Sequence, residues 1–464
     1  MIARLRALLM AIVIAMTGGA ALAQTAPFDG QAATYAVRRY LQRNGVPGAV
    51  AVVTEGDHVV WRGGFGHDAD GRALTANSRL PICSVSKSFV ALAVMQQVEA
   101  GRVALDAPVV RYVPEFRLAD PRGAQITVRQ LLAHRSGLSD RGFREKSVRP
   151  TPRSLAEAVA ALRDARLAAD PGARRSYTNP NYWVAARLVE VVSGQPFDAY
   201  MRRQVFQPLG MSRTSVWNGV DDAPDVARGH VRVFGRAVAA REPAWFLGGA
   251  CGVVTTADDM GRWLVMHTTG RSPVDGAALV SPASLQAMHD GLGWNRLETD
   301  GRRSFAHNGI MFTYSADQVL LPDLGPGRGV AVIADAGVGL APLPADELAQ
   351  LLVAVAEGRP AKQPPPTGLI VDAVLGLIAL AVLVIAVLRW RSPPRERPMW
   401  RRALGIVVDA LPVAWLAFYP AALRSLLGRD LDWRQALYAG PMLFVLVAAL
   451  AVVGAGAIVR RLRR

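Results

Sequence analysis

The sequence predicts an α+β domain, an antiparallel β-sheet flanked by helices with a helical insertion, followed by a C-terminal bundle of three transmembrane helices. Three observations support this fold class. Strand patterns occur near both ends of the domain, helical patterns occur between them, and three long apolar stretches follow a proline-rich segment. One sheet to which both ends of the domain contribute accounts for this order of elements.

The strand patterns are short apolar runs bounded by turn residues. Residues 48–53 and 58–61 lie on either side of Glu55-Gly56-Asp57, which predicts a hairpin. Residues 317–321 and 329–334 predict two further strands near the other end of the domain.

The helical patterns begin and end at capping residues. Ser154 is followed by Glu157, which is the spacing of a capping box. A second pattern covers residues 182–192 and ends at Gly194, and a third begins at Thr256.

Length and composition exclude several classes of protein. Of the 464 residues 51% are hydrophobic, which excludes a disordered chain, and two cysteines are too few for a disulfide scaffold or a multi-cysteine zinc module. The net charge of +16 is concentrated at the two ends, beside apolar runs. This pattern is typical of membrane proteins and makes nucleic-acid binding the weaker interpretation.

Residues 1–23 have the pattern of a secretory signal peptide. Arg4 and Arg6 precede a short apolar run, and Ala21-Leu22-Ala23 places small residues at the cleavage position. An uncleaved anchor helix is the alternative.

A proline-rich linker, residues 358–366, leads to the membrane region, residues 367–464. Its apolar stretches, 368–388, 403–423 and 436–459, are each long enough to cross about 30 Å of hydrocarbon as a helix. The first connection and the C-terminus are rich in arginine, so the positive-inside rule predicts that both are cytoplasmic. We therefore expect a multi-pass protein of the inner membrane, with the preceding domain in the periplasm.

Two acids lie within the apolar stretches. Asp372 is about one turn from the start of its helix, so an interfacial position explains it. Asp409 lies deeper, and we expect it to pair with an arginine near a helix end or to make a helix–helix contact.

The central chemical feature is Ser84-Val85-Ser86-Lys87 at the start of an apolar helical run. Positions three apart share a helix face, so the side chains of Ser84 and Lys87 can meet. A serine hydroxyl needs an adjacent base to act as a nucleophile, and burial lowers the pKa of a lysine toward that role. The alternative is that Ser84 only caps the helix while Lys87 extends to solvent.

This motif resembles the nucleophile motif of the serine β-lactamase and penicillin-binding protein superfamily, and is most similar to the class C-like branch. That branch includes β-lactamases, D-alanyl-D-alanine carboxypeptidases, D-amino-acid peptidases and esterases. Further segments resemble the branch in the same order: residues 126–138, Tyr177-Thr178-Asn179, residues 252–260, residues 291–294 and His307-Asn308-Gly309. The resemblance implies a serine hydrolase domain over residues 24–357.

The resemblance also implies roles for individual residues. Ser84 would be the acylated nucleophile, Lys87 its proton acceptor and Tyr177 a second acid or base. Asn179 would orient Lys87 and donate to a substrate amide. Turn chemistry alone is the alternative for Tyr177 and Asn179, and His134, within residues 126–138, is expected to be structural.

His307 and Gly309 would lie on an edge strand beside the site, and the backbone N–H groups of Ser84 and Ile310 would form the oxyanion hole. A role as a plain strand-end residue is the alternative for His307. Efficient class C β-lactamases have Lys-Thr-Gly where this chain has His307-Asn308-Gly309. A neutral histidine supplies less positive charge for a substrate carboxylate than a lysine, so peptidase or esterase chemistry is favoured over strong β-lactamase activity.

Cys83 precedes the nucleophile, and Cys251 lies in a segment that borders the site in the similar proteins. In an oxidising compartment a Cys83–Cys251 disulfide would brace Ser84, and two buried free thiols are the alternative.

These patterns predict a membrane-anchored periplasmic serine hydrolase for small-molecule or peptide substrates: peptidoglycan-derived D-amino-acid peptides first, then esters and β-lactams. The alternative is a penicillin-binding-like sensor that is acylated without efficient turnover, although the cytoplasmic side offers only short arginine-rich segments. No metal or cofactor is predicted, because the seven histidines are scattered and the sequence has no zinc or phosphate-binding motif. No nucleic-acid partner is predicted.

Overall fold

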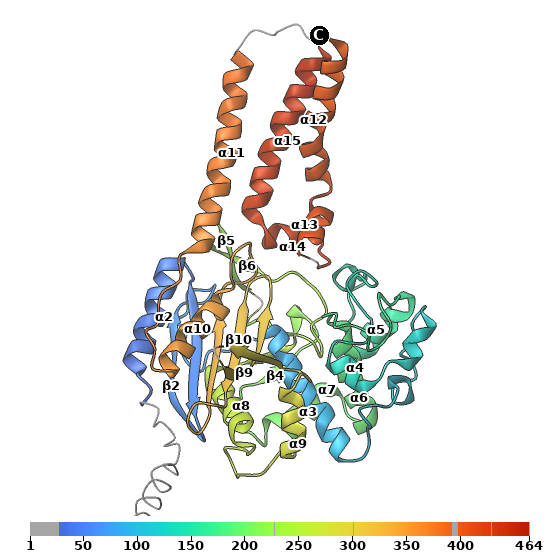
Figure 1. The fold of residues 1–464 in the computed structure, drawn as a ribbon, viewed down its shortest axis with the longest axis vertical. Coiled ribbons are helices and arrows are strands. Elements are labelled where there is room, and N and C mark those ends of the chain that lie inside the picture. The colour runs from blue at the N-terminus through green and yellow to red at the C-terminus, as the bar shows by residue number, and fades with distance from the viewer. Residues whose placement is uncertain (1–26, 227, 300, 392–397, 428, 464) are drawn as a thin grey trace, which may run out of the picture.

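The computed structural model describes residues 27–226, 228–299, 301–391, 398–427 and 429–463 (Figure 1). The predicted signal peptide lies outside the described residues.

Six strands form the central antiparallel sheet, in the order β2-β1-β11-β10-β9-β8. Their bounds are β1 Gly48–Glu55, β2 His58–Gly66, β8 Asn295–Thr299, β9 Arg302–Ile310, β10 Ser315–Leu321 and β11 Arg328–Ala334. β1 pairs with β11 along its whole length, so both ends of the domain meet inside one sheet, as predicted. The predicted strand patterns correspond to β1, β2, β10 and β11, whereas β8 and β9 had no clear pattern because β8 is largely solvent-exposed.

The sheet separates two apolar cores. Ala49, Ala51 and Val53 pack toward α2 (Gly30–Asn44) and α10 (Pro344–Ala356) on one face. Alternate residues of the same strand pack on the other face against α3 (Ser86–Glu99) and α8 (Ala257–Thr269), because successive side chains of a strand point to opposite faces. This second core continues into the helical insertion, which forms a lobe beside the sheet (Figure 1).

The other helices of the domain are α4 Val128–Leu132, α5 Leu155–Ala160, α6 Pro180–Ser193, α7 Phe197–Met201 and α9 Pro282–His289. Two smaller sheets are formed by β3 Leu80–Pro81, β7 Val253–Thr255 and β4 Ser215–Val216, and by β5 Arg228–Val233 with β6 Arg236–Arg241. The predicted helix ends are confirmed at Thr256, whose Oγ1 caps α8, and at Gly194, which ends α6 in the left-handed region. The predicted capping box is formed only in part: Ser154 Oγ accepts from the N–H of Glu157 at 3.2 Å, but the Glu157 carboxylate accepts from the N–H of Arg153 at 2.9 Å.

Residues 367–464 are predicted to lie in the membrane and are called the membrane region for that reason. The helices described there are α11 Thr367–Arg391, α12 Met399–Ala417, α13 Tyr419–Leu427, α14 Trp433–Ala439 and α15 Pro441–Leu462. Among the described residues, α11 and α15 are each long and apolar enough to cross a membrane, and α12 with α13 is a third candidate if the bent pair is one span. The structure corrects the second predicted stretch, because α12 and α13 meet at 78°. Pro420 lacks an N–H group and its ring would collide with a continuing helix, so a new helix begins there.

The acids within the apolar stretches have partners. Asp409 on α12 accepts from Arg461 Nε on α15 at 2.8 Å, which is the predicted pairing with an arginine near a helix end. Asp372, in the first turns of α11, accepts from the N–H of Gly235 at 2.9 Å in the β5–β6 hairpin. The membrane region therefore contacts the preceding domain.

Candidate active site

Ser84 lies in a short 3-10 turn, Cys83–Val85, that leads directly into α3. The strand β9 runs against this turn, and Gly309 makes that approach possible. A Cβ atom at Gly309 would lie 2.1 Å from the carbonyl oxygen of Ile82 and 3.2 Å from the backbone nitrogen of Ser84. Cys83 Sγ also donates to the carbonyl oxygen of Ile310 at 2.8 Å. The structure thus brings Ile310 beside the nucleophile turn.

Lys87 is completely buried one helical turn after Ser84. Its Nζ donates to Ser84 Oγ at 3.0 Å, to Asn179 Oδ1 at 2.8 Å and to the carbonyl oxygen of Ala250 at 3.0 Å. Three acceptors match the three N–H groups of an ammonium ion. The structure therefore brings the serine, the lysine and the asparagine together, and the alternative in which Lys87 extends to solvent does not hold.

The charge state of Lys87 differs from the sequence prediction. Burial by itself lowers the pKa of Lys87, as expected, but the neighbouring Tyr177, Cys251 and Cys83 raise it, and the net direction is upward. The prediction of a lowered pKa is therefore wrong, because it treated the apolar helix as the only influence on the lysine. The upward shift favours the protonated form of Lys87 in the resting site.

Tyr177 lies above the lysine. The centre of its ring is 4.9 Å from Lys87 Nζ and 4.3 Å from the ring centre of His134. His134 is buried and its ring packs against that of Tyr177, so its position agrees with the structural role expected for His134.

His307 is buried on β9 with its ring centre 6.3 Å from that of Tyr177. Its Nδ1 lies 2.7 Å from the carbonyl oxygen of Asn308, which can only accept, so Nδ1 carries the hydrogen. Burial, together with the positive charge of Lys87, lowers the pKa of His307 to about 3. The imidazole is therefore neutral and supplies no fixed charge to a substrate carboxylate.

We expect His307 to leave no titration step in the activity profile. The His307→Gln variant should keep the shape of the wild-type curve of kcat/KM between about pH 5 and pH 8, since the imidazole does not change charge there. The measurement is a pH–rate profile with a nitrophenyl ester, and a wild-type step near pH 6.5 that the variant lacks would contradict it. The unfolded chain binds a proton near pH 6.5 that folded His307 does not bind until about pH 3, so this group lowers the free energy of unfolding as pH falls across that interval.

Two buried acids beside Asn179 escaped the sequence prediction. Glu145 Oε1 accepts from Asn179 Nδ2 at 2.8 Å, and Asp140 Oδ1 accepts from Thr178 Oγ1 at 2.9 Å. Burial and the charge of Glu145 raise the pKa of Asp140 to about 6. No local motif marks these acids, because they reach the site from a loop outside the segments that resemble known motifs.

The predicted Cys83–Cys251 disulfide is not formed in the structure. Both cysteines are free and buried, and their sulfurs lie 3.9 Å (Cys83) and 3.7 Å (Cys251) from Ser84 Oγ. Cys83 Sγ is directed to the carbonyl oxygen of Ile310 instead. Burial would raise the pKa of the Cys251 thiol, but the contact with Cys83 and the charge of Lys87 lower it to about 7.

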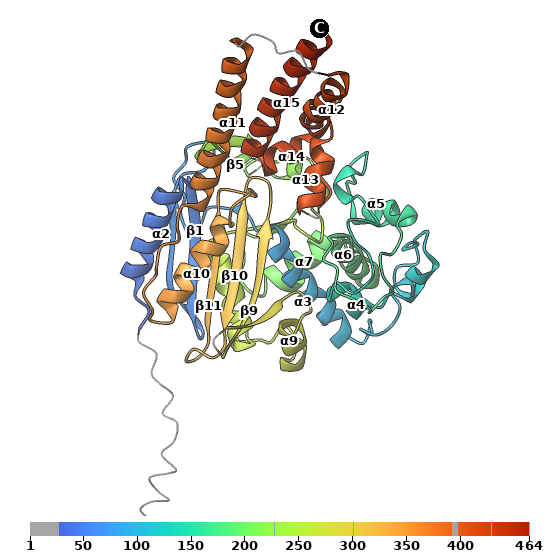
Figure 2. The same cartoon turned by 45° about the horizontal axis from the view of Figure 1, so that its top comes forward.

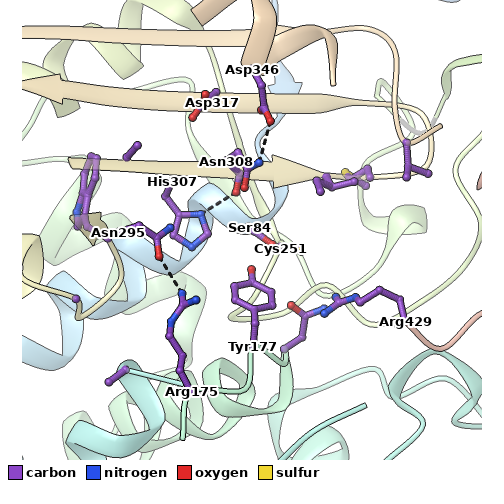
Figure 3. Close-up of a pocket in the computed structure, with 18 of the residues that line it drawn as sticks. Ser84, Arg175, Tyr177, Cys251, Asn295, His307, Asn308, Asp317, Asp346 and Arg429 are labelled. Atoms are coloured by element: carbon purple, nitrogen blue, oxygen red, sulfur yellow. Dashed lines mark hydrogen bonds between the residues drawn. The ribbon is translucent and has the colours of Figure 1, made fainter. Parts of the chain in front are cut away.

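Ser84 opens into a cleft with a volume of about 1380 Å³. Figure 3 shows Arg175 and Arg429 on opposite sides of Tyr177 at this cleft. On one side Arg175 Nη2 donates to Asn295 Oδ1 at 2.8 Å.

The other side of the cleft is largely apolar and receives residues of the membrane region. Its apolar lining residues are Trp245, Met311, Phe312, Leu427, Leu431 and Ala439. Phe312, Leu431 and Ala439 belong to one apolar cluster that joins the β9–β10 turn to α13, α14 and α15. The cleft is therefore bounded by both parts of the chain.

Comparison with known proteins agrees with this site. The family model described as Beta-lactamase matches residues 34–354, which include the nucleophile turn, Tyr177 and β9. The chain belongs to the Beta-lactamase family. Within this family, Penicillin-binding protein 4 of Amycolatopsis lactamdurans is 31% identical over 318 residues, covering 63% of this chain and 82% of that protein.

Two other similar proteins broaden the comparison. Esterase EstB of Burkholderia gladioli is 34% identical over 186 residues, which are 37% of this chain and 47% of the esterase. The structure of an octameric penicillin-binding protein homologue from Pyrococcus abyssi superposes with a TM-score of 0.60 at 25% identity, over 75% of this chain and 81% of that chain. The protein is thus a serine hydrolase of the Beta-lactamase family.

Proposed function

We propose that the protein is a membrane-anchored serine hydrolase that forms an acyl-enzyme at Ser84 with amide or ester substrates. The observation that carries the proposal is the 3.0 Å contact between Lys87 Nζ and Ser84 Oγ at the wall of a large cleft, with β9 against the nucleophile. A hydroxyl held by a buried cation in this way is suited to losing its proton, since the cation stabilises negative charge that develops on the oxygen.

The proposed reaction has two steps. Ser84 Oγ attacks the carbonyl carbon while its proton passes to Tyr177 Oη, which acts as a phenolate beside the Lys87 ammonium, and the N–H groups of Ser84 and Ile310 stabilise the oxyanion. The Tyr177 hydroxyl then gives the proton to the leaving amine or alcohol, which departs and leaves the acyl group on Ser84. Water attacks this ester in the second step, and the same groups transfer its proton to Ser84 Oγ.

The charges around the cleft favour some substrates over others. Because His307 is neutral, the position of the Lys-Thr-Gly lysine offers no positive charge to a β-lactam carboxylate. D-amino-acid peptides and esters therefore rank before β-lactams. The names of the two curated relatives, an esterase and a penicillin-binding protein, agree with both chemistries.

The proposed location is the inner membrane with the hydrolase domain in the periplasm. The apolar helices α11 and α15 support the anchor. The arginine-rich first connection and C-terminus favour a cytoplasmic position for those ends, and an odd number of spans then puts the hydrolase domain on the other side.

The test uses the full-length protein in detergent and compares the wild type with Ser84→Ala. We expect a fluorophosphonate probe to label the wild type and not the variant, and a nitrophenyl ester or D-Ala-D-Ala dipeptide to be turned over only by the wild type. Ser193→Ala, at the end of α6, is the matched control and should label normally. Equal labelling of Ser84→Ala would contradict the proposal, and stable labelling by a fluorescent penicillin without any turnover would support the sensor alternative instead.

A further inference from the structure

The connection between α13 and α14 lies beside the active site. Figures 1 and 2 show both helices at the end of the membrane region that faces the hydrolase domain. Leu427, Arg429 and Leu431 line the same cleft as Ser84. A simple anchor would not need to contribute side chains to that cleft.

Charge complementarity joins this connection to the loop that follows Asp140. Asp430, which is fully buried, lies 3.4 Å from Arg144, and Asp432 lies 3.0 Å from Arg149. Single exposed ion pairs contribute little, but here the pairs accompany a shared apolar cluster around Phe312. The contact between the membrane region and the hydrolase domain is therefore both apolar and ionic.

In a third contact the membrane region supplies the arginine and the hydrolase domain supplies the acids, and this arginine, Arg429, lines the active-site cleft. Its Nε lies 3.4 Å from Asp140 Oδ2, and its Nη2 lies 3.5 Å from Glu145 Oε1. The guanidinium also lies 5.6 Å from the centre of the Tyr177 ring. Its side chain is 31% exposed, whereas that of Glu145 is 1% exposed, so the arginine reaches the buried acid from the cleft side.

A continuous chain of contacts leads from Arg429 to the nucleophile. The Glu145 oxygen that faces Arg429 also accepts from Asn179 Nδ2 at 2.8 Å. The other end of the Asn179 amide accepts from Lys87 Nζ at 2.8 Å, and Lys87 donates to Ser84. The amide of Asn179 is oriented by these two contacts, with its nitrogen toward Glu145 and its oxygen toward Lys87.

We propose that Arg429 is a positioning residue of the active site, through which the membrane region takes part in catalysis. Arg429 holds the Glu145 carboxylate, Glu145 fixes the Asn179 amide, and the amide fixes Lys87 against Ser84. This inference rests on the proposed function, because it assigns Arg429 to the same reaction.

The physical reason is the position of Glu145. A buried carboxylate is costly without a cation beside it, so without Arg429 the Glu145 side chain is no longer held in place and can move toward water. That movement frees the Asn179 amide to turn, and Lys87 then loses the acceptor that sets its direction. Residues that orient a catalytic group in this way typically change activity about 10–100-fold when they are replaced.

The first experiment measures kcat and KM of full-length Arg429→Gln in detergent with a neutral and an anionic nitrophenyl ester. We expect kcat to fall about tenfold or more for both esters, with little change in KM. Arg429→Lys, which keeps the charge, should recover part of kcat. Arg434→Gln is the matched control, because Arg434 donates to the carbonyl oxygen of Arg241 in the hydrolase domain, away from the contacts that lead to Lys87.

Three outcomes would overturn the proposal. Arg429→Gln with kcat within twofold of the wild type would remove any positioning role. A rise in KM for the anionic ester alone would make Arg429 a substrate-binding residue. An equal loss of kcat in Arg434→Gln would mean that the contact between the two parts, and not Arg429, is what matters.

A double-mutant cycle tests the route. If Arg429 acts through Glu145, then Glu145→Gln and the double variant Arg429→Gln/Glu145→Gln should have nearly the same kcat, whereas independent effects would multiply and contradict the route. Fluorophosphonate labelling at Ser84 distinguishes a failure of the proposed acyl-enzyme reaction from a failure of the proposed role of Arg429. Loss of the proposed function appears as an unlabelled wild type, and failure of this inference appears as normal labelling and turnover in Arg429→Gln.

Discussion

Replacing Lys87 by methionine will lower kcat/KM for ester hydrolysis by about 10³-fold. Methionine has nearly the same length as lysine but lacks its charge and its N–H groups. The change removes the donor to Ser84 Oγ and leaves the oxygens of Asn179 and Ala250 without a partner inside the protein. The hydroxyl then has no cation beside it to stabilise the negative charge that develops as its proton leaves.

Steady-state kinetics of purified full-length protein measure this loss, and thermal unfolding in the same detergent shows whether the variant is folded. Lys362→Met is the control, because Lys362 is exposed in the linker, and it should keep wild-type activity. A folded Lys87→Met variant with activity within tenfold of the wild type would show that the reaction does not need the Lys87 cation.

Replacing Gly309 by alanine will lower kcat by at least about 10²-fold. The added Cβ would lie 2.1 Å from the carbonyl oxygen of Ile82, and because that atom belongs to the backbone it cannot turn aside. The strand β9 must move away from the nucleophile turn, which separates the N–H groups of Ser84 and Ile310. Because these two N–H groups stabilise charge that develops in the transition state, their separation lowers kcat more than it weakens substrate binding.

The measurement for Gly309→Ala is kcat and KM with the same nitrophenyl ester, alongside Gly339→Ala. A Cβ at Gly339 meets nothing within 4 Å, so that variant should behave as the wild type. Unchanged kcat in Gly309→Ala would mean that the close approach of β9 to Ser84 is not needed for the reaction.

The sequence was sufficient for the parts of the molecule that depend on local patterns. The strands β1, β2, β10 and β11 are short apolar runs bounded by turns, and the meeting of Ser84 with Lys87 follows from helical spacing. The pairing of Asp409 with an arginine also follows from the cost of an unpaired acid in an apolar environment.

The parts that the sequence did not predict depend on contacts between distant segments. The pKa of Lys87 is lowered by burial but raised by Tyr177 and Cys251, which come from distant segments, and by Cys83 in the adjoining turn. Glu145 and Arg429 are 284 residues apart and meet only because the membrane region folds back against the hydrolase domain. The connection between the second and third apolar stretches carries nearly equal numbers of basic and acidic residues. Its charge pattern therefore gave no indication that Arg429 enters the active site.

The most direct test of the central claim is to find the atom that carries the acyl group. Wild-type protein mixed with an activated ester is quenched in acid during turnover, digested, and analysed by tandem mass spectrometry of the peptide that contains the nucleophile turn. The account predicts a single acyl group on Ser84. An adduct on Cys83, on Cys251 or on Ser86 in place of Ser84, or turnover with no adduct on Ser84 under conditions that trap the intermediate, would contradict it.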